Sequence, residues 1–68
     1  MSERNKLYAS REIQLAEEYL RINPDDQTQK DRLAYWLAFL GRYEEADLIP
    51  VSEKIKALID ERRNNLPV

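Results

Sequence analysis

The residues of this 68-residue chain best suited to chemistry are two pairs of adjacent carboxylates, Asp25 with Asp26 and Glu44 with Glu45. Paired carboxylates can exchange protons with a substrate or bind a cation. Both pairs, however, stand where helices are expected to begin, and there capping and the helix dipole account for them. A calcium loop also needs a central glycine and a closing glutamate, and residues 23–31 have neither. We therefore expect no catalytic residue, no metal site and no enzyme activity.

The amino-acid composition excludes most other catalytic mechanisms. The chain has no cysteine and no histidine, so disulfides, thiol nucleophiles, imidazole bases and the usual zinc ligands are missing. We expect no cofactor. A single glycine, three prolines and 35% charged residues disfavour turn-rich β folds, and the length suffices for one small core. We predict a single all-α domain over residues 1–68 with a flexible tail at 64–68.

The charge balance argues against nucleic acid as a partner. Eleven basic and thirteen acidic residues give a net charge of −2. The most basic stretch, from Lys54 to Arg63, is interleaved with acidic residues, so we interpret it as a solvated helix face rather than a phosphate contact. A small helix-turn-helix DNA-binding regulator remains the alternative, since the chain offers three helices and a turn at Gly41. Its recognition helix would begin with the acidic Glu44 and Glu45, which repel phosphates.

No membrane segment is expected. The longest apolar run, residues 33–40, is far shorter than the roughly 20 residues that span a bilayer. The polar start of the chain does not resemble a signal peptide. We expect a cytoplasmic protein.

Hydrophobic spacing and end signals predict three helices. Residues from about 2 to 22 carry apolar side chains on one half of a helical wheel, and this helix must end before Pro24. Asp26 and Gln29 can form a reciprocal capping box at the start of a second helix, which runs to Leu40 and stops at Gly41. Glu12 lies inside the apolar half of the first helix, and we expect its carboxylate to reach solvent rather than to pair with an arginine of a partner.

Pro50 leaves two alternatives for the third helix. The apolar stripe through Val51, Ile55 and Ile59 keeps its phase across Pro50, which favours one bent helix. The alternative is two short helices, with Ser52 capping the second. The predicted architecture is therefore an antiparallel three-helix bundle whose third helix is kinked or broken at Pro50.

The second helix is apolar on every side from Leu33 to Leu40. A helix of this kind must be covered all round. Its leucines share one face, and Tyr35, Trp36 and Phe39 share another. These three rings are either core residues of a small bundle or part of an exposed patch that binds a helix, an extended peptide or a second copy. The sequence leaves both possibilities open.

The segment from Gly41 to Ala46, GRYEEA, resembles the turn between the two helices of a tetratricopeptide repeat, and Leu33, Ala34 and Leu37 match the packing positions of that repeat's first helix. The resemblance covers about one and a half repeats, from near Ser10 to Leu58. Three positions depart from the family pattern, at Lys30, Pro50 and Leu58. The resemblance implies stacked helical hairpins and a ligand-facing strip on the second helix at Thr28, Asp31, Tyr35, Ala38 and Phe39.

Such repeats stabilise one another by stacking, and about three are needed. This chain has fewer, so extra burial against a partner is expected. The sequence thus predicts a protein–protein interaction module (a small adaptor, chaperone-like subunit or inhibitor) that forms a homodimer or docks on a larger protein. Its candidate binding residues are Thr28, Asp31, Arg32, Tyr35, Trp36, Ala38 and Phe39 of the second helix, with Tyr8, Leu15 and Tyr19 of the first.

Overall fold

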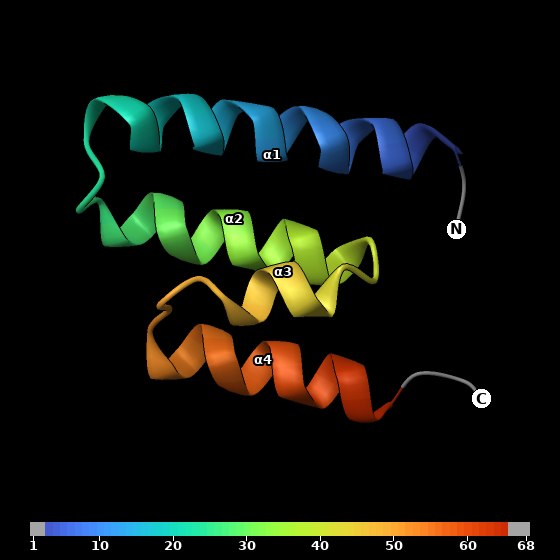
Figure 1. Cartoon of the computed structure of the whole chain (residues 1–68). Helices are drawn as coiled ribbons and strands as arrows, with labels where there is room; N and C mark the ends of the chain where they lie inside the picture. Colours follow the sequence, from blue (N-terminus) through green and yellow to red (C-terminus); the bar gives the residue numbers. More distant parts are fainter. Residues whose placement is uncertain (1–2, 66–68) are drawn as a thin grey trace.

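The computed structural model describes residues 3–65, which form four helices and no strand. The helices are α1 (Glu3–Ile22), α2 (Gln27–Phe39), α3 (Tyr43–Asp47) and α4 (Glu53–Asn64). The predicted all-α class is confirmed. Successive helices run in opposite directions, with α2 between α1 on one side and α3 and α4 on the other (Figure 1). The Cα trace measures 38 × 28 × 16 Å.

The turn between α1 and α2 follows the predicted signals with one difference. The Oδ1 atom of Asp26 accepts a hydrogen bond of 3.3 Å from the backbone N–H of Gln29, as expected of an N-cap. The returning bond of the capping box is missing, because the N–H of Asp26 donates instead to the carbonyl of Asn23 at 3.2 Å. The Oε1 atom of Gln29 is buried without a hydrogen-bond partner. Only half of the predicted box forms.

Gly41 ends α2 as predicted. Its φ of +80° lies in the left-handed region, and it is the one residue of the described range with a positive φ. The N–H of Gly41 donates to the carbonyl of Ala38, and the N–H of Arg42 donates to that of Leu37, both at 2.9 Å. These two bonds satisfy carbonyls that the helix end leaves unpaired and reverse the chain toward α3.

At Pro50 the structure has the broken helix and not the bent one that the apolar stripe favoured. Residues 48–52 are not helical, and Ser52 takes the N-cap position of α4. Its side chain makes no capping bond there. Instead, the N–H and the hydroxyl of Ser52 both donate to Asp31 of α2. Proline has no N–H to donate within a helix, which favours a break at Pro50. The hydrogen bonds from Ser52 to Asp31 then hold the start of α4 against α2.

The core is small and rich in alanine. The buried apolar residues are Ala9, Ile13, Ala16, Ala34, Leu37, Ala38, Ala46 and Ile59. Leu33, Trp36, Leu40 and Tyr43 pack against this cluster but stay partly exposed. No helix within residues 3–65 is long and apolar enough to cross a membrane. Of the predicted tail, residues 66–68 lie outside the described range, Asn64 is the last residue of α4, and Asn65 is its C-cap.

We expect G41A to lower the free energy of unfolding by about 1 to 2 kcal/mol, because a side chain disfavours the left-handed backbone. A Cβ at Gly41 would meet no atom within 4 Å, so the loss is conformational and not steric. G41N serves as the control and should lose less, since asparagine tolerates this region. Urea denaturation checks both; an equal loss for the two variants would contradict the interpretation.

Candidate functional site

A groove of about 550 Å³ lies between α2 and α4. Its lining residues are Thr28, Asp31, Arg32 and Tyr35 of α2 and Ile55 and Leu58 of α4. The four α2 residues are all among those predicted from the sequence. Helical spacing places them on one side of α2, and Ile55 and Leu58 complete the opposite wall, which sequence analysis of α2 alone could not supply.

Asp31 connects the two helices that form this groove through hydrogen bonds. Its Oδ1 accepts hydrogen bonds of 2.9 Å from the N–H of Ser52 and from Nε2 of Gln27, and its Oδ2 accepts one of 2.8 Å from the Ser52 hydroxyl. Burial acts to raise the pKa of Asp31, but these hydrogen bonds outweigh it, and the pKa lies below its usual value. Asp31 therefore fixes the start of α4 against α2.

Arg32 is paired with Glu12 across the α1–α2 seam. Its Nη2 atom lies 2.5 Å from Oε2 of Glu12. Glu12 is only 8% exposed, so the expectation that it reaches solvent is wrong. Glu12 lies on the buried side of α1, as its position on the helical wheel indicates. There α2 brings an arginine of the same chain to the carboxylate, and the spacing of residues within α1 carries no information about this contact.

The aromatic residues of α2 are partly covered by the chain itself. Trp36 is half-buried and makes edge-to-face contacts with Tyr8, Tyr35 and Phe39, at centroid distances of 5.3, 5.4 and 5.4 Å. The guanidinium of Arg62 lies 4.8 Å from the centroid of the half-buried Phe39. Tyr35 stays 38% exposed.

Ala38 does not belong to the exposed binding strip that was predicted from the sequence. It has no exposed surface and belongs to the core cluster, so it cannot touch a partner in this structure. The resemblance to tetratricopeptide repeats placed it on the ligand-facing side, whereas here the close approach of neighbouring helices requires a small buried residue at this position.

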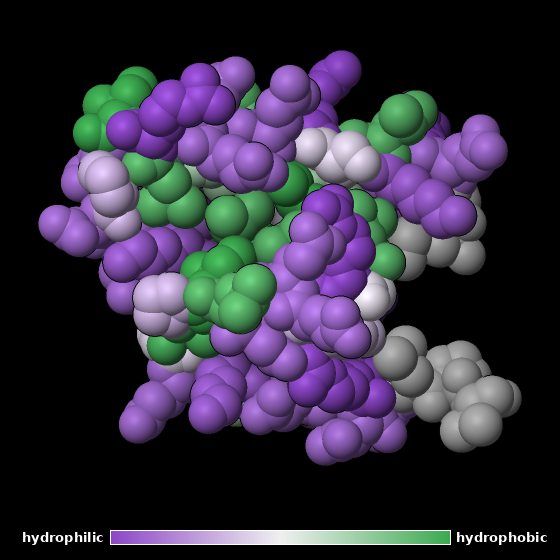
Figure 2. All heavy atoms as spheres, in the orientation of Figure 1, coloured by the Kyte–Doolittle hydropathy of each residue, from purple (hydrophilic) through white to green (hydrophobic). Residues whose placement is uncertain are grey.

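Large apolar side chains of α1 remain exposed beside these aromatics. Tyr8, Leu15 and Tyr19, all predicted, are exposed, and so is Ile22, which was not selected from the sequence. Spacings of three and four residues put them on one side of α1. In Figure 2, hydrophobic atoms follow the seam between α1 and α2, while hydrophilic residues cover most of α4.

These exposed residues and the groove are continuous. Tyr8 touches Trp36, Trp36 touches Tyr35, and Tyr35 lines the groove opposite Leu58. The resulting surface, which we name the open face, consists of Tyr8, Leu15, Tyr19, Ile22, Tyr35 and Leu58. All six side chains are exposed.

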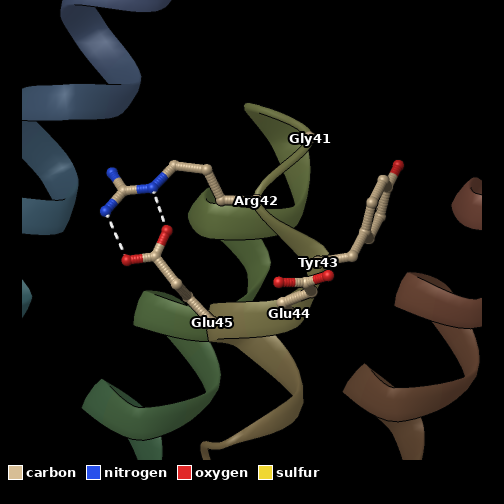
Figure 3. A pocket seen from close by; sticks show the side chains of 5 residues that line it. All are labelled: Gly41, Arg42, Tyr43, Glu44 and Glu45. Carbon is tan, nitrogen blue, oxygen red and sulfur yellow. Dashed lines mark hydrogen bonds and ion pairs between the residues drawn. The ribbon is translucent and has the colours of Figure 1, made fainter.

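A second hollow, of about 540 Å³, is lined by residues Gly41 to Glu45 (Figure 3). Two bonds join the Arg42 guanidinium to the Glu45 carboxylate, while the Tyr43 ring points away from them. The hydrogen bond to Glu45 raises the pKa of Arg42, and the same bond lowers the pKa of Glu45. Glu45 thus forms a local ion pair with Arg42 at the start of α3.

The basic residues near the end of α4 are engaged within the chain. The guanidinium of Arg63 lies 4.8 Å from the centroid of the Tyr43 ring and pairs with Asp47 at 2.9 Å. Arg62 donates to the carbonyl of Phe39 at 3.3 Å. Both side chains therefore dock α4 onto α2 and α3.

Within residues 3–65 no group of three or more acidic side chains is arranged to hold a metal ion. In the comparisons with known proteins, no protein-family model, curated protein or solved structure matches this chain.

We expect D31N to lower the free energy of unfolding by about 1 kcal/mol near pH 7, because it removes the charge that strengthens three hydrogen bonds. The folded pKa of Asp31 is depressed, so its contribution is present above the unfolded value of 3.8 and is lost as the pH falls through the folded pKa. Urea denaturation between pH 7 and pH 2 should show the wild-type advantage vanish at low pH. A difference that is constant with pH would argue against this role.

The Glu12–Arg32 pair predicts an asymmetric effect of mutation. R32M leaves a carboxylate whose side chain is 11% exposed without its cation, and should lower the free energy of unfolding by about 2 kcal/mol. E12M leaves a guanidinium that is 42% exposed and can be hydrated, and should cost less than about 1 kcal/mol. Urea denaturation of both variants measures the order; equal costs would contradict it.

Proposed function

We propose that this chain is a non-catalytic protein-binding module that acts through the open face, as a homodimer or as a subunit docked on a larger protein. The observation that carries the proposal is the continuity of this surface from α1 across α2 to α4. Three of its six residues are tyrosines, which combine a large apolar area with a polar tip and are enriched at interfaces.

The small core supports the same proposal. Among residues 3–65, five of the eight buried apolar residues are alanines, and no large side chain is fully buried. A chain of this length buries a modest fraction of its surface, and alanines add little to it. Covering the open face with a partner would add the burial of several large side chains at once.

We also propose that the helices are a divergent form of tetratricopeptide-like hairpins. Support comes from Gly41 at the end of α2, from the buried Ala34 and Ala46, and from the groove along Thr28, Asp31 and Tyr35. The break at Pro50 is the main departure from that family's pattern. The DNA-binding alternative finds less support, since Arg62 and Arg63 contact rings and carbonyls of the chain itself.

The test compares the same substitution inside and outside the open face. L58E places a charge in the groove, whereas L48E places one on Leu48, which is 83% exposed and does not line the groove. Immobilised full-length chains are used to capture partners from native lysate. We expect L58E to abolish retention of the partner and L48E to preserve it, with unchanged helical circular dichroism for both. Equal retention by the two variants would refute the proposal.

A further inference from the structure

One side of α1, which we name the seam, is exposed except at Glu12 and has the residue spacing by which two helices pack together. Tyr8, Glu12, Leu15, Tyr19 and Ile22 follow one another at alternating steps of four and three residues. This is the heptad pattern by which two helices pack along their length. The neighbouring side of α1, with Ala9, Ile13 and Ala16, is already buried. Glu12, the polar residue of this set, is paired with Arg32, so the surface available to a second helix consists of the apolar residues.

Two charged residues beside the seam favour one orientation of a second helix, parallel or antiparallel. Arg11 and Glu18 are one heptad apart and flank the same edge of the seam. Both are exposed, and the structure gives neither a side-chain hydrogen bond nor an ion pair among residues 3–65. In a parallel pair this edge of the two helices would lie on opposite sides of the interface, so Arg11 and Glu18 would find no charged partner there. An antiparallel copy would place Arg11 opposite its Glu18 and Glu18 opposite its Arg11.

We infer that α1 is a self-association helix, on which α1 of a second copy of this chain packs antiparallel with Arg11 facing Glu18 of that copy. The inference rests on the proposed binding role of the open face and specifies the occupant of the part that lies on α1. The twofold axis then passes beside Leu15, which meets the same residue of the second copy. Tyr8 of each copy meets the segment from Tyr19 to Ile22 of the other.

The exposed area fits one second copy. Tyr8 and Tyr19 are 56% and 52% exposed, and Ile22 is 84% exposed. Since a tyrosine carries about 150 to 250 Å², these residues with Leu15 and Tyr35 offer an apolar area on the order of 500 Å². A protein interface of standard size buries about 800 Å² per partner, and about two thirds of a homodimer interface is apolar. An amphipathic helix of another protein could cover the apolar residues of the seam. A second copy also brings a side chain of opposite charge to both Arg11 and Glu18 of each chain.

Sedimentation equilibrium of the full chain at micromolar concentration tests the inference by charge reversal. We expect a dimer for the wild type, a roughly 10- to 100-fold larger dissociation constant for R11E and for E18R, and recovery in R11E/E18R, because the double variant restores both pairs. K6E is the matched control, since position 6 lies on the opposite side of α1 and is exposed. A monomeric wild type, or no recovery in the double variant, would overturn the inference.

A cysteine introduced at the twofold axis gives a second, independent measurement, because the chain has no cysteine of its own. L15C should form a disulfide between two copies on mild oxidation, since the two thiols would lie near each other. L7C, on another side of α1 and 71% exposed, should remain reduced. Equal cross-linking of both variants would overturn the antiparallel arrangement. If L58E still abolishes partner capture in that case, the proposed binding role stands and only the self-association fails.

Discussion

Alanine at the helix contacts is the constraint on which the rest of this structure depends. Ala9 and Ala16 of α1 and Ala34 and Ala38 of α2 are fully buried. Small side chains let neighbouring helices approach closely, but each contributes little apolar burial. Within residues 3–65, α1 packs mainly against α2, and α2 lies between α1 and the pair α3 and α4 (Figure 1). Tyr8, Leu15 and Tyr19 on the other side of α1 stay exposed. An exposed apolar surface follows from this way of packing.

Polar contacts between helices supplement the small core. Glu12 binds Arg32 across the α1–α2 seam, and Asp31 binds Ser52 where α4 begins. Arg63 covers the ring of Tyr43 and pairs with Asp47. Each contact has a direction, which apolar burial lacks, so each fixes how one helix is placed against the next. This division of roles explains how a chain with few large buried residues holds four helices in defined positions.

The candidate site combines residues that the sequence could identify with others that it could not. Tyr35, Tyr8 and Tyr19 were predicted because their types and helical phase mark an amphipathic surface. Leu58 of α4 was not, because its place beside Tyr35 depends on where α4 returns after Pro50. Ala38 was assigned to the wrong side of α2, since the resemblance used for it does not report how closely the helices pack here.

The sequence by itself determined the all-α class, the ends of α1 and α2 at the turn that joins them, the end of α2 at Gly41, and the absence of cysteine and histidine chemistry. These properties depend on signals within a few residues, such as Asp26 before α2 and Gly41 after it. Only the tertiary structure decided that the helix at Pro50 is broken and that Glu12 is buried. Both outcomes depend on partners about twenty residues away, Asp31 for Ser52 and Arg32 for Glu12, and local spacing carries no information about such contacts.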